Sequence, residues 1–495
     1  MQATANNNVK SPDFSVAIVG SGFGGLGMAI RLMQEGRKDF VVLEKDTEVG
    51  GTWRDNTYPG CACDVPSHLY SFSFERQSSW SRMYPRQSEL LVYLRHCADK
   101  YDVRSRIRFN SALSEARFDE TNNWWEITTN NGDKLTARSL VTAMGGLSRP
   151  SIPKLPGIEK FQGPAFHSAQ WDHQFDFSGK RVAVIGTGAS AIQFVPELQK
   201  TVAQLHLFQR TPPWILPKAD RPITGREHWM MKWVPGYMRM FRNLIYWRQE
   251  MTAIGFTLKP SLMAKGKKFA LDYLQRKVAD PVLRAKLTPD YEMGCKRILL
   301  SNNYLPALCQ PNVSLHDTRD MTEITERGII VNGVEQPVDA IIYGTGFRAT
   351  DVFSPLRIFG RNGVDINDVW NGSGIEAYYG TTVAGYPNLF MLLGPNTGLG
   401  HNSIVFMIES QINYVLKCLD LMRERRSNTI ECLPQAQRDF NAELEADMRG
   451  TVWGGGCKSW YFDANGRNVT LWPGFTFSYW WKMKTVVVDS YRFGS

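Results

Sequence analysis

Two segments of the chain share one pattern, in which a short apolar run leads through a glycine-rich turn into apolar residues at helical spacing. The two runs are residues 14–19 and 181–185, and the turns after them begin at Gly20 and Gly186. A continuous apolar run is typical of a parallel strand that is covered on both faces. The pattern predicts an α/β fold with two Rossmann-like dinucleotide-binding domains.

Breaks in this pattern indicate where the domains meet. A stretch rich in Pro and Gly at residues 148–157 is incompatible with a helix or a central strand. It therefore separates a first domain at about 12–150 from a second domain at about 152–350. Another buried strand and glycine turn occupy residues 338–347. We expect residues 351–495 to return to the first domain and to supply loops for substrate and cofactor.

The stretch at about 216–292 differs in character from its surroundings, because Trp, Met and Tyr crowd together in it. Tyr237, Phe241, Leu244 and Ile245 follow helical spacing, so we predict a helical insert in the second domain. The insert either packs on its own domain, or forms a wall of the substrate entrance or a patch for a membrane surface. Basic residues among the aromatic ones suit a membrane surface. Spacing alone does not separate these alternatives.

Composition narrows the class of protein. The chain has 495 residues, 43% of them hydrophobic and 21% charged, which suits two or three globular domains. No run approaches the roughly 18 apolar residues of a membrane-spanning helix. Residues 1–13 are polar and lack the apolar stretch of a signal peptide. These features favour a soluble, cytoplasmic protein.

Charge and cysteine content argue against a nucleic-acid-binding protein and against a zinc or redox-active cysteine site. The net charge of +9 is mild and suits attraction of an anionic dinucleotide. The chain has no block of clustered Lys and Arg with interleaved aromatic residues, so nucleic acid is a less favoured partner. The eight Cys residues form no Cys-x-x-Cys pair, which argues against a zinc site or a redox-active pair. We therefore expect reduced thiols and no metal site.

The first glycine-rich turn is Gly20-x-Gly22-x-x-Gly25. In such a turn the first glycine permits the tight bend, the second admits a pyrophosphate, and the third lets helix and strand pack closely. Glu44 ends the next apolar run, 24 residues after Gly20, where a carboxylate accepts from ribose hydroxyls. The motif predicts a dinucleotide with a free 2′-hydroxyl, and an ordinary glycine-rich turn is the alternative.

The second turn is Gly186-x-Gly188-x-x-Ala191, and the same interval of 24 residues leads from Gly186 to Arg210, which Thr211 follows. A guanidinium and a hydroxyl bind a 2′-phosphate, which a carboxylate repels. The contrast between the two turns predicts FAD at the first and NADPH at the second. It indicates a flavoprotein that NADPH reduces.

Residues 161–172, between the two turns, have the sequence FQGPAFHSAQWD. This segment resembles the fingerprint Phe-x-Gly-x-x-x-His-x-x-x-Trp-(Pro/Asp) of type I Baeyer–Villiger monooxygenases, a family of class B flavoprotein monooxygenases. Residues 50–64, from Gly50 to Asp64, match a second motif of that family. Together with the glycine motifs, the resemblance extends over nearly the whole chain. It assigns His167 to the connection between the domains rather than to acid–base chemistry.

The resemblance implies roles for three charged residues. Arg297 matches the catalytic arginine, whose fixed charge stabilises negative oxygen near the flavin. Asp64 matches the residue that holds this arginine, since a buried arginine requires a carboxylate partner. Lys296 matches a second contact to the 2′-phosphate. The alternatives are a surface basic pair for Lys296 and Arg297 and a simple turn residue for Asp64.

The resemblance also assigns three aromatic residues to the cofactors. Trp53 and Tyr70 match positions that line FAD, although core aromatic residues are the alternative. Trp460 matches a loop residue that reaches the nicotinamide ribose.

The activity implied is NADPH-dependent conversion of ketones into esters or lactones with O2, through a C4a-peroxyflavin, together with oxidation of sulfides. Two alternatives stay open. The first is an N- or S-oxygenating flavin-containing monooxygenase of the sister family, which usually differs from Trp171 and Asp172 at the end of the fingerprint. The second is an NADPH oxidase or redox-sensing flavoprotein, which requires neither Arg297 nor Asp64.

Overall fold

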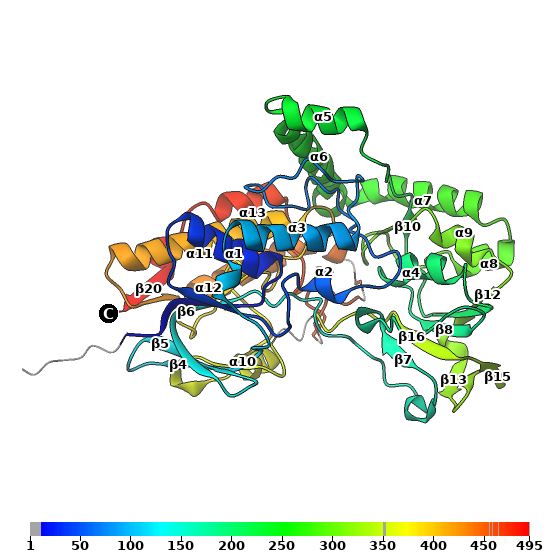
Figure 1. Ribbon diagram of the computed structural model, residues 1–495, viewed down its shortest axis with the longest axis horizontal. Coiled ribbons are helices and arrows are strands. Elements are labelled where there is room, and N and C mark those ends of the chain that lie inside the picture. Colours follow the sequence, from blue (N-terminus) through cyan, green and yellow to red (C-terminus); the bar gives the residue numbers. More distant parts are fainter. Residues whose placement is uncertain (1–10, 350–352, 455, 458, 464, 495) are drawn as a thin grey trace, which may run out of the picture.

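The structure, a computed structural model, describes residues 11–349, 353–454, 456–457, 459–463 and 465–494. The chain forms two α/β lobes, with a helical projection above the junction between them (Figure 1). The expected domain boundary at residues 350–351 lies outside the described residues. The same holds for residues 1–10, which belong to the segment that we expect not to be a signal peptide.

The first lobe is built on a mixed sheet with the strand order β17-β4-β5-β6-β1-β2-β3, and β18 also pairs with β6. The strands are β1 (Phe14–Val19), β2 (Phe40–Leu43), β3 (Ile107–Arg108), β4 (Leu113–Asp119), β5 (Trp124–Thr129), β6 (Lys134–Thr142), β17 (Arg357–Phe359) and β18 (Leu389–Met391). β1 is parallel to both β2 and β6, whereas β4, β5 and β6 form an antiparallel meander. Because β17 and β18 join this sheet, the C-terminal part of the chain returns to the first lobe.

Helices cover the sheet of the first lobe. They are α1 (Phe23–Gln34), α2 (Thr52–Asp55), α3 (Gln87–Lys100), α10 (Ile366–Ser373), α11 (Ile404–Glu424), α12 (Pro434–Arg449) and α13 (Thr476–Lys482). Figure 1 shows α1, α3 and α11 side by side above the strands. A short antiparallel pair, β19 (Thr429–Cys432) and β20 (Tyr491–Gly494), lies near the C-terminal end.

Side chains of β1 alternate between two separate apolar clusters. Val16 and Ile18 pack in the cluster that contains α1, whereas Ala17 and Val19 pack with Trp125 in the other. Both faces of β1 are therefore buried, as its continuous apolar run predicts.

The second lobe contains a parallel sheet with the strand order β12-β9-β8-β16-β7. Its strands are β7 (Ala165–His167), β8 (Arg181–Ile185), β9 (Gln204–Gln209), β12 (Val313–Asp317) and β16 (Ala340–Tyr343). Helices α4 (Ala191–Leu198) and α9 (Tyr304–Leu308) pack beside it. The strands β13 (Met321–Ile324), β14 (Gly328–Val331) and β15 (Val334–Pro337) form a separate antiparallel sheet that packs against side chains of β8, β9 and β16. The predicted α/β fold with two Rossmann-like domains is confirmed.

The segment between β9 and β12 carries the helical insert. It holds α5 (Gly225–Trp233), α6 (Tyr237–Ala253), α7 (Met263–Lys277) and α8 (Pro281–Lys286), with the short parallel strands β10 (Ile215–Leu216) and β11 (Leu299–Leu300) at its base. Helices α5 and α6 form the projection at the top of Figure 1. Within the described ranges, we find no helix whose length and apolar character would let it span a bilayer.

Candidate active site

A cavity of about 1030 Å³ lies between the two lobes. The first lobe contributes Trp53 and Asp64 to its wall, the second lobe contributes Gly188 and Arg210, and the C-terminal part contributes Asn402. Small-molecule sites usually measure roughly 300–1,000 Å³. The volume of the cavity therefore lies at the upper end of the range for a small-molecule site.

The first glycine turn joins β1 to α1. Gly20 has a φ of +98°, and a Cβ on Gly25 would collide with the Gly20 carbonyl oxygen, so the third glycine permits the close contact of helix and strand. Gly22 is the N-cap of α1, and no side chain caps this helix end. The first backbone N–H groups of α1 are thus available to an anion.

Glu44 follows β2 beside this turn and is buried. Its Oε2 accepts hydrogen bonds from the Ser21 backbone N at 2.8 Å and the Ser21 hydroxyl at 2.6 Å. Its Oε1 accepts one from Arg54 Nη1 at 3.0 Å. The carboxylate therefore lies at the turn, as its spacing predicts. A ribose hydroxyl would donate to the same carboxylate that already accepts from Ser21 and Arg54.

The second glycine turn joins β8 to α4 and lines the cavity. Gly186 has a φ of +107°, and a Cβ there would collide with the Gly344 carbonyl oxygen. A Cβ on Gly188 would meet only that same oxygen, at 3.8 Å, so this backbone faces open space. Ala191 begins α4, and its methyl group packs against Gly344. No side chain caps α4, whose N-cap is Ser190.

Arg210 and Lys296 lie near each other on the cavity wall. The pKa of Lys296 is lowered, first by burial and then by the positive charge of Arg210. Lys296 Nζ lies 4.6 Å from the ring centroid of Tyr291. The structure gives neither cation an ion pair within the residues that it describes. Thr211 also lines the cavity, and its carbonyl accepts from the Thr187 hydroxyl at 3.3 Å.

Arg297 and Asp64 form an ion pair across the two lobes. Arg297 Nε and Nη2 lie 2.9 and 2.7 Å from the same carboxylate oxygen of Asp64. About a third of each side chain is exposed, 32% and 29%, and both residues line the cavity. The pair therefore fixes a positive charge at the wall of the cavity.

The two partners shift each other's pKa in the directions that keep both ionised. The negative charge of Asp64 raises the pKa of Arg297 above its already high value. Burial alone would raise the pKa of Asp64, but the charge and hydrogen bonds of Arg297 outweigh it, so this pKa is lowered. Lys218, which donates to the Cys63 carbonyl at 2.9 Å, adds to the positive potential at Asp64.

The aromatic residues of the sequence analysis lie in different settings. Trp53 and Tyr70 line the cavity and meet edge to face, with ring centroids 5.5 Å apart. Trp460 is exposed at the cavity wall. His167 is buried, and its Nδ1 accepts from the Ala169 backbone N at 3.1 Å. Trp171 packs in the core, 5.3 Å from the ring of Phe194.

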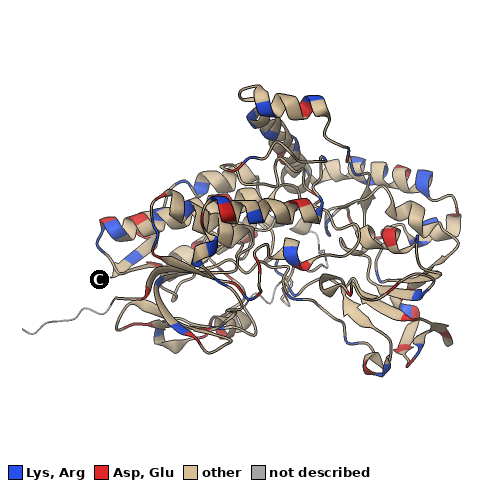
Figure 2. Ribbon diagram, viewed as in Figure 1, with Lys and Arg blue, Asp and Glu red and all other residues tan. Residues whose placement is uncertain are grey.

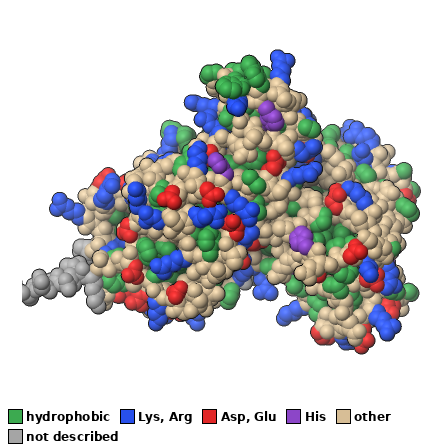
Figure 3. Space-filling model, in the orientation of Figure 1, with side chains coloured by type: hydrophobic (Ala, Val, Ile, Leu, Met, Phe, Trp, Pro, Cys, Tyr) green, Lys and Arg blue, Asp and Glu red, His purple; other side chains and the backbone are tan. Residues whose placement is uncertain are grey.

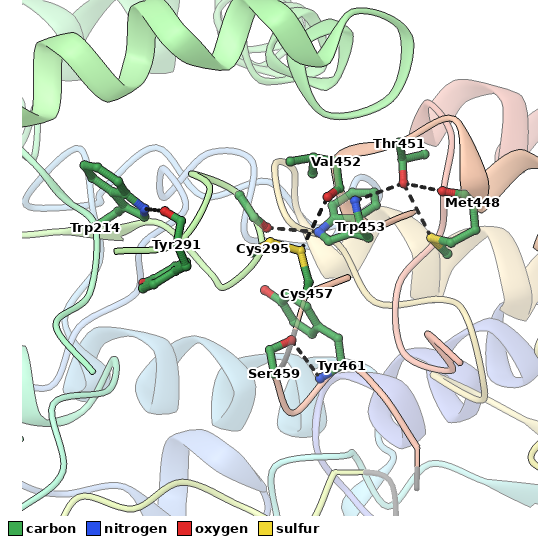
Figure 4. The surroundings of a disulfide bond; sticks show 11 residues. Trp214, Tyr291, Cys295, Met448, Thr451, Val452, Trp453, Cys457, Ser459 and Tyr461 are labelled. Carbon is green, nitrogen blue, oxygen red and sulfur yellow. Dashed lines mark hydrogen bonds between the residues drawn. A yellow bond between two sulfur atoms is a disulfide. The ribbon is translucent and has the colours of Figure 1, made fainter. Parts of the chain in front are cut away.

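The expectation of eight reduced thiols is wrong, because Cys295 and Cys457 form a disulfide (Figure 4). The two residues are 162 positions apart, and only the fold brings their Cα atoms to 5.3 Å. Cys295 directly precedes Lys296, and Cys457 lies in the loop that carries Trp460. Trp453 reinforces this link, because its Nε1 donates to the Gly294 carbonyl at 3.0 Å.

Two polar residues at the site escape the sequence analysis. Gln193 of α4 joins the lobes, since its amide donates to the Ala62 carbonyl at 2.9 Å and accepts from Tyr58 at 3.1 Å. Glu250 of α6 accepts from Asn402 Nδ2 at 2.6 Å. The helical spacing of Tyr237, Phe241, Leu244 and Ile245 gives no signal for Glu250, because Glu250 lies on the opposite side of the helix from that set. Nothing in the sequence around Gln193 indicates its role.

Comparisons with known proteins agree with this geometry. Residues 13–354 match the family model described as flavin-binding monooxygenase-like. A Baeyer–Villiger monooxygenase of Pseudomonas aeruginosa is 52% identical over 467 residues, which cover 94% of this chain and 88% of that protein.

Solved structures are similar over almost the entire chain. Cyclohexanone monooxygenase from Rhodococcus sp. Phi1, bound to NADP+, has a TM-score of 0.89 and 29% identity over 98% of this chain and 100% of that one. The OTEMO complex with FAD and NADP has a TM-score of 0.87 and 28% identity, again over 98% of this chain and 100% of that one.

Proposed function

The chain belongs to the flavin-binding monooxygenases and, within them, to the Baeyer–Villiger monooxygenases, and on that premise we propose that it converts ketones into esters or lactones with FAD, NADPH and O2. The similarity to structures that hold FAD and NADP supports these two cofactors. The ketone itself is part of the proposal.

The residues at the first glycine turn fit FAD. The uncapped start of α1 offers backbone N–H groups to a pyrophosphate, and the Glu44 carboxylate lies beside it for a ribose. Trp53, Asp64 and Tyr70 line the cavity between the lobes. We therefore assign Gly20, Gly22, Gly25, Glu44, Trp53, Asp64 and Tyr70 to the FAD site.

The residues at the second glycine turn fit NADPH. The open backbone at Gly188 and the uncapped start of α4 would hold the pyrophosphate. The adjacent cations Arg210 and Lys296, which repel each other, would both be stabilised by a 2′-phosphate. We therefore assign Gly186, Gly188, Ala191, Arg210, Thr211, Lys296, Arg297 and Trp460 to the NADPH site.

When both cofactors are bound, NADPH supplies a hydride, and the flavin delivers one oxygen atom of O2 to the substrate. Arg297 stabilises the negative charge that develops on oxygen during this transfer, because its guanidinium stays protonated at working pH. Asp64 orients Arg297 because its carboxylate accepts hydrogen bonds from Nε and Nη2 of the guanidinium.

The observation that carries the proposal is the Arg297–Asp64 pair at the wall of a cavity that also contains the second glycine turn. The direct experiment incubates the purified protein with NADPH, O2 and a panel of cyclic and open-chain ketones, and follows products by mass spectrometry. We expect esters or lactones. NADPH consumption that yields hydrogen peroxide alone would overturn the proposal and favour an oxidase.

Two narrower points belong to the same proposal. We expect oxidation of sulfides in addition to ketones, which the same product analysis tests with a thioether. We also propose that the protein works in the cytoplasm, and fractionation of cells that express it tests this location.

A further inference from the structure

Helices α5 and α6 and the turn between them expose an unusual set of large apolar side chains. We call this set the apical patch: Trp229, Trp233, Val234, Met240, Leu244, Trp247 and Met251. Trp233 and Leu244 are 63% and 62% exposed. Figure 3 shows hydrophobic side chains gathered at the top of the molecule, over the tip of the helical projection. Contiguous exposed apolar surface of this kind marks a contact with a partner or a membrane.

The outward apolar stripe of α6 follows from its register. Met240, Leu244, Trp247 and Met251 recur at intervals of three and four residues, so they lie on one side of the helix. The opposite side, where α6 meets the body of the protein, buries Arg242, Ile245, Glu250 and Ala253. A surface helix normally turns its apolar stripe toward the core. The outward stripe of α6 is therefore not explained by packing of the fold.

Polar contacts fix the inner side of α6. Arg242 donates to the Ser71 hydroxyl at 3.2 Å and is buried. Glu250 accepts from Asn402 at 2.6 Å and from the Thr476 hydroxyl at 2.7 Å. Because Asn402 lines the cavity between the lobes, α6 links the apical patch to the wall of that cavity.

The apolar surface continues from α6 onto α13. The rings of Trp247 and Phe477 lie 6.2 Å apart, and Trp480 and Trp481 on α13 are also exposed. Lys484 lies over the ring of Trp480, 3.8 Å from its centroid. Aromatic rings with neighbouring cations are typical of proteins that lie at a membrane–water interface.

The exposed charges of α5 and α6 have one sign. The two helices carry four side chains that are both charged and exposed: Arg226, Lys232, Arg239 and Arg248. Their acidic residues are Glu227, which pairs with Arg221, and Glu250, which is buried. Along α5 and α6, Figure 2 accordingly shows more basic than acidic segments.

From these features we propose that the apical patch docks the protein onto the surface of a membrane that contains anionic lipids. The Trp side chains enter the headgroup region, and the surrounding Lys and Arg side chains contact the anionic headgroups. Docking on the surface, rather than insertion across it, agrees with the short helices of the projection. The proposal does not depend on the reaction that the cavity performs.

A second copy of the chain is the other candidate occupant, and charge disfavours it. In a two-fold symmetric contact, the same patch of each copy meets the other. Such a contact would bring cations against cations, since the exposed charges of α5 and α6 are all positive. An anionic lipid surface satisfies the apolar and the charged residues of the patch together.

The test is flotation of the holoenzyme with phosphatidylcholine vesicles that do or do not contain phosphatidylglycerol. We expect binding to the mixed vesicles, and weaker binding to phosphatidylcholine alone. The variant Trp233→Ser/Leu244→Ser/Trp247→Ser should lose binding, and Lys232→Glu/Arg239→Glu should weaken it by roughly fivefold or more for each cation lost. The matched control is Val92→Ser/Val334→Ser, which alters equally exposed apolar residues away from the patch and should bind like the wild type.

Bound flavin and the rate of NADPH oxidation, measured for each variant, show whether it is folded. Wild-type protein that does not bind the mixed vesicles at low salt would overturn the proposal, as would a folded patch variant that binds as well as the control. Light scattering adds a further decisive outcome. If the wild type is a dimer and the patch variant is a monomer, the patch is covered by a second copy and the membrane proposal is wrong.

Discussion

Arg297 and Asp64, 233 positions apart in the sequence, meet at the wall of the cavity through two contacts to one carboxylate oxygen, at 2.9 and 2.7 Å. The residues come from different lobes, so the relative position of the lobes determines this contact. A cation with a matched carboxylate keeps its charge and its direction. This pair makes Arg297 a fixed electrostatic element rather than a mobile surface side chain.

Substitution of Arg297 tests its role directly. We expect Arg297→Ala to retain FAD and to accept hydride from NADPH, but to form ester about 10²- to 10³-fold more slowly, since the charge that stabilises negative oxygen is lost. Flavin absorbance, NADPH consumption and ester yield measure the three properties separately. Asp64→Ala should also lower the ester yield, because Arg297 then lacks its orienting partner. Ester formation by Arg297→Ala at the wild-type rate would remove Arg297 from the mechanism.

Arg210 should determine the preference for NADPH. Charge-assisted hydrogen bonds contribute roughly 1.5–3 kcal/mol, so Arg210→Ala should raise the KM for NADPH about 10- to 100-fold. The KM for NADH should change little, because NADH has no 2′-phosphate. Steady-state kinetics with both cofactors provides the comparison. An equal effect on the two cofactors would mean that Arg210 does not contact the 2′-phosphate.

The affinity for NADPH should fall at alkaline pH through Lys296. Burial and the charge of Arg210 lower the pKa of Lys296, so the ammonium loses its proton at a lower pH than an ordinary lysine. The protonated form is the one that attracts the 2′-phosphate. The KM for NADPH should therefore rise as pH increases through this lowered pKa.

The variant Lys296→Arg is the control for this pH dependence, because arginine stays charged throughout the range. Its KM for NADPH should depend less on pH than that of the wild type, and NADH should show no such difference. Identical alkaline profiles for wild type and Lys296→Arg would assign the titration to another group.

The Cys295–Cys457 disulfide should stabilise the loop that carries Trp460. A disulfide typically contributes about 2–4 kcal/mol to the free energy of unfolding, so Cys457→Ser should lower the Tm. It should also raise the KM for NADPH several-fold, because the loop is then joined less firmly to the segment of Lys296 and Arg297. The exposed free thiol Cys309 supplies the control variant, Cys309→Ser, which should change neither quantity. Equal Tm and KM values for the two variants would deny the disulfide this role.

The glycine turns were predictable because their information is local. Each consists of a strand, a turn and a helix in consecutive residues. The close packing of helix and strand requires a glycine at position 25, and the motif itself contains that glycine. The contrast between Glu44 and Arg210 is also local, since each follows its turn at the same interval. The parallel strands next to each turn, the two lobes and the choice of cofactors follow from these segments.

Contacts between distant segments were not predictable from the residues alone. The Arg297–Asp64 pair came from a family resemblance, and the Cys295–Cys457 disulfide was missed because no local spacing indicates it. The helical spacing in α6 predicted a helix but not its orientation. Leu244 is exposed and Ile245 is buried, although both belong to the same apolar set, because tertiary contacts select the buried side.

The most direct test of the central claim is the fate of molecular oxygen. The purified protein, loaded with FAD, is supplied with NADPH, a ketone that it accepts and isotopically labelled O2, and the product is analysed by mass spectrometry. The account predicts an ester or lactone with one labelled oxygen atom, formed in proportion to the NADPH consumed, and loss of this product in Arg297→Ala. NADPH consumption with labelled hydrogen peroxide and no ester, or oxygenation confined to amines and sulfides, would contradict it.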